Sequence, residues 1–139
     1  METRTRIAAY VVAVNTERLL LARIASGYPG ARRWTLPGGG VEFGEHPEDA
    51  LVREVYEESG FAMDSFRYLG IDSRVYPASD QRGELHAIRM MYTAELSGTP
   101  EVTEVDGSVD TAAWIPLADL DATDTVDLVS AALRIAGLN

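Results

Sequence analysis

The stretch GGVEFGE at residues 39–45, which continues directly into His46 to Phe61, decides how the rest of this 139-residue chain is interpreted. Its second half carries the local signals of a short helix. His46 suits the N-cap, Pro47 suits the first helical position, and Gly60 supplies a left-handed stop. We therefore expect a helix that ends near Gly60.

Three glutamates lie in the last turns of this predicted helix. Glu54, Glu57 and Glu58 have the spacing i, i+3 and i+4, so they project from one side. Each like-charge pair costs roughly 0.2–0.5 kcal/mol, and a helix C-terminus is the unfavourable end for anions. A hard cation such as Mg²⁺ takes oxygen ligands and would reverse this repulsion. The spacing therefore predicts a metal site, with a solvated acidic face as the alternative.

The sequence LPGGG at residues 36–40 places three glycines just before the acidic stretch. Glycine allows the backbone to bend sharply and to come close to another group. The carbonyl oxygen of Gly38 could then join the oxygen ligands of a metal.

The full pattern resembles the signature of the Nudix hydrolases. It meets nine constrained positions within 23 residues, from Gly39 to Phe61: Gly39, Glu45, Arg53, Glu54, Val55, Glu57, Glu58, Gly60 and Phe61. The resemblance implies an α/β fold, a Nudix-type α/β/α sandwich with a mixed β-sheet between helices. It also implies a single Nudix domain over residues 1–139.

The same resemblance implies a reaction: hydrolysis of a pyrophosphate bond in a nucleoside diphosphate linked to another group, with Mg²⁺ or Mn²⁺ as cofactor. Nucleoside triphosphates, ADP-ribose, sugar nucleotides and dinucleoside polyphosphates all remain open as substrates. By carry-over from the family, Glu54, Glu57 and Glu58 are metal ligands, with Gly38 as an addition. Arg53 is expected to be a catalytic helper that pairs with Glu45 or Glu57.

The general base is less defined. Glu54 is the first choice for a residue that orients or deprotonates the attacking water, and Glu57 belongs to the same catalytic set. Some family members use an acid from a later loop, for which Glu101, Glu104 and Asp106 are the candidates. Counting back from Trp114, the position where relatives often carry that acid falls near Ser108.

The residues that precede the glycines suggest how a substrate is held. Arg32 or Arg33 could bind a phosphate, Trp34 could stack on a base, and Gly39 would approach the substrate with its backbone. The alternatives are that both arginines are solvated and that Trp34 anchors the loop in the core.

Composition limits the class of protein and its partners. Net charge is −10 and there is no cysteine, which excludes disulfides, thiolate chemistry and cysteine-based zinc sites. An acidic chain repels nucleic acid and anionic membranes, so we expect a small-molecule nucleotide as the partner, with no nucleic acid and no membrane. The resemblance to Nudix hydrolases implies a homodimer, and we expect the protein to be cytoplasmic. The alternative functions are a catalytically silent nucleotide-sensing module and a purely structural acidic domain.

Hydrophobic patterns predict the remaining elements. The first strand should be covered on both faces, because it is apolar at successive positions. A long hairpin should follow the helix, and an amphipathic helix should close the chain. In order, we expect strands over Arg6 to Val14 and Leu19 to Ile24, a loop over Ser26 to Arg33, a hairpin over Phe61 to Tyr76 and His86 to Leu96, an irregular segment over Ser97 to Ser108, a strand over Val109 to Ile115, a turn that starts at Pro116 and a helix over Thr125 to Ala136.

Overall fold

The computed structural model describes residues 1–138. It contains eight strands, two α-helices and one 3₁₀-helix. Their bounds are β1 Arg4–Val12, β2 Val14–Asn15, β3 Arg18–Ile24, β4 Trp34–Thr35, β5 Gly38–Gly40, α1 Pro47–Ser59, β6 Arg67–Tyr76, β7 Leu85–Thr93, β8 Val109–Pro116, η1 Leu117–Ala122 and α2 Asp127–Ala136.

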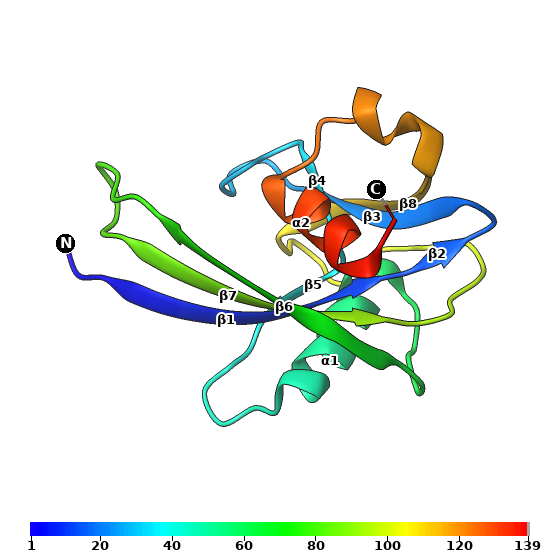
Figure 1. Cartoon of the computed structure of the whole chain (residues 1–139), viewed down its shortest axis with the longest axis horizontal. Coiled ribbons are helices and arrows are strands. Elements are labelled where there is room, and N and C mark those ends of the chain that lie inside the picture. Colours follow the sequence, from blue (N-terminus) through cyan, green and yellow to red (C-terminus); the bar gives the residue numbers. More distant parts are fainter. Residues whose placement is uncertain (139) are drawn as a thin grey trace.

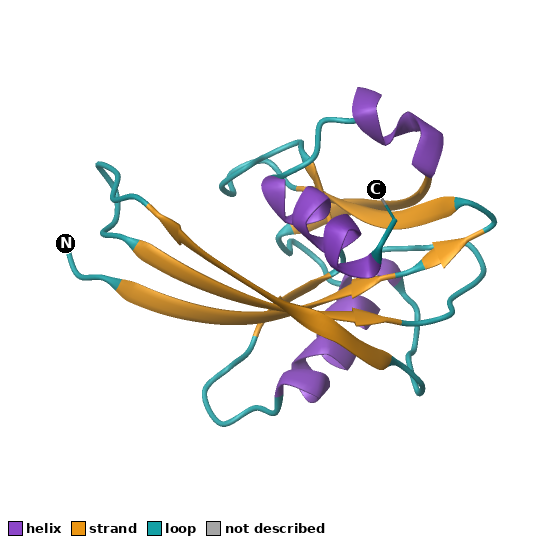
Figure 2. Cartoon of the chain, viewed as in Figure 1, coloured by secondary structure: helices purple, strands orange, loops and turns teal. Residues whose placement is uncertain are grey.

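The strands form two sheets. The first has the order β5-β1-β7-β6 and is mixed, because β1 and β7 are parallel while the other pairs are antiparallel. In the second sheet, β3 pairs antiparallel with β2, β4 and β8. Helices α1 and α2 lie on opposite sides of the mixed sheet (Figures 1 and 2), which confirms the predicted α/β/α sandwich.

Strand β1 divides the hydrophobic core into two clusters. Its side chains alternate between the faces of the sheet, so Tyr10 and Val12 pack in the cluster with α2, whereas Ala9 and Val11 pack in the cluster with α1. Because both faces are covered, the strand is apolar at consecutive positions, as the sequence predicted.

Helix α1 begins and ends where the sequence indicated. The His46 Nδ1 accepts a hydrogen bond of 3.0 Å from the Glu48 N–H, which makes His46 the N-cap. Gly60 adopts φ 78°, and its N–H donates to the Tyr56 carbonyl at 2.8 Å. Leu51 and Val55 are fully buried against β1 and orient the helix, so the glutamates of its other face are directed toward β5.

Helix α2 is joined to the sheet by a polar cluster around one buried arginine. Arg89 of β7 is 6% exposed. It donates hydrogen bonds to Asp72 of β6 and to Asp127, the first residue of α2. It also donates to the Tyr76 hydroxyl at 2.8 Å, and that hydroxyl donates to Asp127. Arg74 forms a further ion pair with Asp127 at 2.7 Å. We call these five residues the Arg89 cluster.

Two elements differ from the sequence-based expectation. The glycines at 38–40 were expected as a bend, but they form the short edge strand β5 and pair with β1. Only Gly38 has a positive φ, at 141°, so the bend is confined to the entrance of that strand. After Pro116 the chain continues into the 3₁₀-helix η1 rather than a simple turn.

Candidate active site

Glu58 is the most buried acid of the predicted metal set. Its side chain lies under β5, where one carboxylate oxygen accepts a hydrogen bond of 3.1 Å from the Gly38 N–H. The residue is 4% exposed, so very little water reaches its charge. Gly38 therefore contacts the acidic helix face through its backbone N–H, and the predicted role of its carbonyl oxygen as a metal ligand stays a prediction.

Gly39 leaves space beside β5 that the Glu54 carboxylate occupies. A Cβ atom at Gly39 would lie 2.8 Å from the Glu54 carboxylate, which is closer than real side-chain contacts. The absent side chain thus allows the carboxylate of α1 to lie directly against the backbone of β5.

Arg53 lies among the acidic residues of this site. It makes a two-pronged contact with Glu45, with Nε–Oε2 at 3.0 Å and Nη2–Oε1 at 2.9 Å. Its Nη1 also donates to Glu54 at 2.8 Å and lies 3.7 Å from Glu57. The predicted pairing of Arg53 with Glu45 and Glu57 is therefore present. It fixes the loop at residues 41–46 against the helix.

A fifth acid reaches the site from the irregular segment that precedes β8. The N–H groups of Thr103 and Glu104 donate to the Glu57 carbonyl at 2.9 and 3.1 Å. The Glu104 carboxylate is close enough to Glu57 to raise the pKa of Glu57. Of the three later acids considered from sequence, Glu104 is the one whose side chain the structure brings to the helix glutamates. Ser108 instead accepts a backbone hydrogen bond from Ala25.

Burial and mutual repulsion shift the titration of these acids. Burial is the main reason that the pKa of Glu58 is raised well above its usual range; the Gly38 N–H partly offsets this, and the charge of Glu54 adds to it. Burial likewise raises the pKa of Glu54 and of Glu57, and Glu104 raises that of Glu57 further. Hydrogen bonds from Arg53 lower the pKa of Glu45 to about 2. The site thus holds more negative charge than Arg53 neutralises.

The donor set can be tested against a metal ion. Within residues 1–138, no three acidic or histidine side chains are already arranged to hold a metal. Instead the acids form two close pairs, Glu54 with Glu58 and Glu57 with Glu104. Every side-chain donor is a carboxylate oxygen, the ligand type that Mg²⁺ and Mn²⁺ take. The residues fit such a cation in chemistry, although they do not form a closed cage without it.

The residues predicted to hold the substrate lie elsewhere, with the exception of Gly39. Arg32 pairs with Asp110 at 3.4 Å, and Arg33 pairs with Asp124 at 3.1 Å. Trp34 is half-buried in β4 and packs against the cluster with α2. The structure therefore gives both arginines an acidic partner and Trp34 a place beside the core, so their role toward a substrate stays a prediction.

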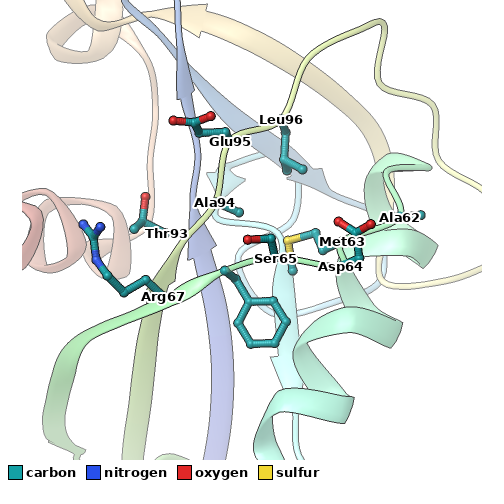
Figure 3. A pocket seen from close by; sticks show the side chains of 10 residues that line it. Ala62, Met63, Asp64, Ser65, Arg67, Thr93, Ala94, Glu95 and Leu96 are labelled. Atoms are coloured by element: carbon teal, nitrogen blue, oxygen red, sulfur yellow. The ribbon is translucent and has the colours of Figure 1, made fainter.

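A pocket of about 560 Å³ is separate from this site. It lies between the segment at residues 62–67 and the end of β7 at residues 93–96. Figure 3 shows that Glu95 and Asp64 point in different directions and that Arg67 points away from the other lining residues. Its polar groups do not converge, and it contains none of the α1 glutamates.

Comparison with known proteins identifies the family. A model of the NUDIX domain matches residues 4–133. The crystal structure of a MutT Nudix hydrolase from Burkholderia pseudomallei superposes with a TM-score of 0.79 at 30% identity, covering 94% of this chain and 96% of that one. The chain therefore belongs to the Nudix hydrolase family, as the sequence pattern indicated.

Two curated relatives share about a third of their aligned residues with this chain. Mouse oxidized purine nucleoside triphosphate hydrolase is 33% identical over 101 residues, which are 72% of this chain and 62% of that protein. The NAD-capped RNA hydrolase NudC of Haemophilus influenzae is 33% identical over 122 residues, 84% of this chain and 43% of that protein. The chain thus spans less than two thirds of the length of either relative.

No helix within the described residues is both long and apolar enough to cross a membrane.

Proposed function

We propose that this protein hydrolyses a pyrophosphate bond in a nucleoside diphosphate linked to another group, with Mg²⁺ or Mn²⁺ as cofactor. The observation that carries the proposal is the excess of carboxylates at the end of α1. Glu54 and Glu57 lie 2.8 and 3.7 Å from Arg53, whose charge Glu45 already offsets, and Glu58 and Glu104 add two further acids beside them. Strongly shifted acids that cluster without a balancing charge are typical of functional sites.

Glu54, Glu57 and Glu58 would hold the cation, and the Gly38 carbonyl would be the backbone addition. When bound, the cation supplies neutralisation of the negative charge that develops on the phosphates. The chain itself supplies position: Arg53 holds Glu45 and Glu54 in place, and the glycine strand lets the diphosphate lie close to the backbone.

Glu54 is our first choice for the residue that orients the attacking water and accepts its proton. It lies against Gly39 and is oriented by Arg53. Glu104 is the alternative base, because its loop places it beside Glu57. Replacing Glu54 and Glu104 separately by glutamine distinguishes the two candidates. The variant that lacks the general base should lose turnover and still bind the substrate with its metal ion.

The names of the relatives direct the substrate search. Nucleoside triphosphates come first, because the mouse relative is named for an oxidized purine nucleoside triphosphate, and nucleotides linked through a diphosphate follow, because the bacterial relative is named for NAD-capped RNA. We keep ADP-ribose, sugar nucleotides and dinucleoside polyphosphates in the panel. We also propose a homodimer in the cytoplasm; light scattering in solution and cell fractionation test these two points.

The test is a substrate panel with Mg²⁺ or Mn²⁺ in ¹⁸O-labelled water, with products identified by mass. We expect at least one substrate to yield two phosphate products, one of which carries a single ¹⁸O atom. Glu58→Gln should abolish the reaction, and Glu17→Gln, an exposed acid in the turn before β3, should not. Tight nucleotide binding without any turnover across the panel would instead support a nucleotide-sensing module.

A further inference from the structure

Arg6 differs from every other arginine in the described chain. Six of the twelve arginines form ion pairs with acids, namely Arg23, Arg32, Arg33, Arg53, Arg74 and Arg89. Five others are exposed to water, namely Arg4, Arg18, Arg67, Arg82 and Arg134. Arg6 is half-buried, yet within residues 1–138 it forms no ion pair.

An unpaired, half-buried guanidinium is unexpected in this protein. The chain has 22 acidic residues against 12 arginines, so acids are available to pair with nearly any position. Removing a charge from water without a partner costs free energy, so such a group is retained where something else supplies the opposite charge. Arg6 uses Nη1 for a hydrogen bond of 3.3 Å to the Tyr10 hydroxyl, and a guanidinium has five N–H donors.

Arg6 lies beside strand β5, the same strand that the Glu54 carboxylate contacts from its other face. Ala8 of β1 is paired with Gly40 of β5, and the Arg6 guanidinium covers Gly40: a Cβ atom there would lie 3.2 Å from Nη2. A Cβ atom at the preceding Gly39 would instead meet the Glu54 carboxylate. Because neighbouring residues of a strand face opposite sides, Arg6 and Glu54 lie on the two faces of the same short strand.

Strand β5 is at the edge of the mixed sheet, so a ligand that crosses its free edge can contact both of its faces. It has three residues, all glycine, and it pairs only with β1, so its other edge carries no strand. On the Glu54 side, Arg53 lies 3.4 Å from the Gly40 carbonyl through its Nη2, but its charge is taken up by Glu45 and Glu54. Arg6 is therefore the guanidinium at this strand whose charge is still available.

We propose that Arg6 binds a phosphate of the substrate, on the face of β5 opposite Glu54. A diphosphate that crosses the free edge of β5 at Gly39 and Gly40 would place one phosphate among the α1 glutamates and the adjoining phosphate on Arg6. This rests on the proposed pyrophosphate substrate. It gives Arg6 the role that the sequence suggested for Arg32 or Arg33, which are each already paired with an aspartate.

The test measures binding with a probe that cannot be hydrolysed. Methylenediphosphonate with Mg²⁺ is titrated calorimetrically into wild type, Arg6→Gln, Arg6→Lys and Arg4→Gln. Arg4 is the matched control, because it lies on the same strand and is exposed. Arg6→Gln should weaken binding about 10- to 100-fold, the range for charge-assisted hydrogen bonds, Arg6→Lys should lie between it and wild type, and Arg4→Gln should stay within about twofold.

Three results would overturn the proposal. They are unchanged binding in Arg6→Gln, an equal loss in Arg4→Gln, and no binding of methylenediphosphonate by wild type. A parallel titration with adenosine distinguishes the base from the phosphate: adenosine affinity that falls in Arg6→Gln while diphosphonate affinity does not also contradicts it. A thermal melt of each variant shows whether it is folded. If Arg6→Gln does not fold, the binding measured for Arg6→Lys tests the proposal in its place.

Steady-state kinetics of Arg6→Gln test the phosphate-binding role of Arg6 separately from the proposed hydrolase activity. On any substrate that wild type hydrolyses, Arg6→Gln should raise KM about 10-fold or more with a smaller change in kcat, since the contact positions a phosphate rather than reacting. Wild type that binds methylenediphosphonate through Arg6 but hydrolyses nothing would refute the enzyme and keep the phosphate site. Hydrolysis with unchanged KM in Arg6→Gln would do the reverse.

Discussion

Arg53 and Arg89 both lie among acidic side chains, but their surroundings differ in charge balance. In the Arg89 cluster, two arginines face two aspartates, and the Tyr76 hydroxyl completes the hydrogen bonding. At Arg53, one guanidinium pairs with Glu45, Glu54 and Glu57, and Glu58 and Glu104 add two further acids beside these glutamates. A balanced cluster can serve as a structural joint, whereas an unbalanced one requires a positive partner.

The pKa shifts show the same contrast. Burial alone would raise the pKa of Asp127, but the Tyr76 hydrogen bond and the charge of Arg89 lower it overall. The pKa of Glu58 is raised well above its usual range, mainly by burial. The fold therefore stabilises the charged form of Asp127 and destabilises the charged form of Glu58. Similar residue types thus join elements at one site and leave an excess of negative charge at the other.

The largest expected effect comes from replacing one acid of each site by its amide. Glu58→Gln should lower kcat by about 10⁴-fold, near 5 kcal/mol, because it removes a ligand of the cation that neutralises the reacting phosphates. Asp72→Asn in the Arg89 cluster should leave kcat within about threefold in the protein that remains folded. Steady-state kinetics on the best panel substrate measures both. Comparable losses in the two variants would remove the distinction between the sites.

The second effect is on the free energy of unfolding, to which the Arg89 cluster should contribute more than the Arg53 site. Arg89→Met should lower the free energy of unfolding by about 3–4 kcal/mol, because it leaves two aspartates without their buried partner. Arg53→Met should cost about 1 kcal/mol or less, because the Arg53 side chain is 30% exposed against 7% for Arg89. Urea denaturation followed by circular dichroism measures both values. A larger loss at Arg53 than at Arg89 would contradict a mainly structural role for the Arg89 cluster.

The third effect is a pair of opposite pH dependences, measured in EDTA. Glu58 has a raised pKa, so its contribution to stability is complete below its ordinary value of 4.5 and is lost as pH rises through the value in the fold. Asp127 has a lowered pKa, so its contribution is present above its ordinary value of 3.8 and is lost as pH falls.

Thermal melts of wild type, Glu58→Gln and Asp127→Asn at a series of pH values separate the two pH dependences. As pH rises above 4.5, Glu58→Gln should become steadily more stable than wild type. The advantage of wild type over Asp127→Asn should instead shrink as pH falls below 3.8. If the stabilities of both variants relative to wild type changed in the same direction with pH, the two acids would not lie in opposite environments.

The smallest effect is stabilisation by the cation without substrate. Mg²⁺ at about ten times its dissociation constant should add roughly 1.4 kcal/mol, which raises Tm by about 5 °C in a domain of this size. Glu58→Gln should lose this shift, whereas Arg89→Met should keep it from a lower starting Tm. Sodium chloride at equal ionic strength controls for screening; an identical shift with sodium would mean that no specific cation site exists.

Local spacing was enough to predict helix α1 and its acidic face. The i, i+3, i+4 relation of Glu54, Glu57 and Glu58 follows from helix geometry, and His46 and Gly60 mark the ends through backbone preferences of single residues. The contact of Arg53 with Glu45 came from the family pattern, and the structure contains it. The strand character of the glycines was missed, because glycine carries no strand preference of its own.

The sequence by itself determined the class of fold, the family and the acidic face, because these depend on residues close together along the chain. Only the tertiary structure brought Glu104 to helix α1, since backbone hydrogen bonds to Glu57 over 40 residues away hold its loop there. Only strand pairing placed Arg6 beside Gly40 and gave Arg32 and Arg33 their aspartates. Pairings between distant segments depend on how the whole core packs, and no local preference encodes them.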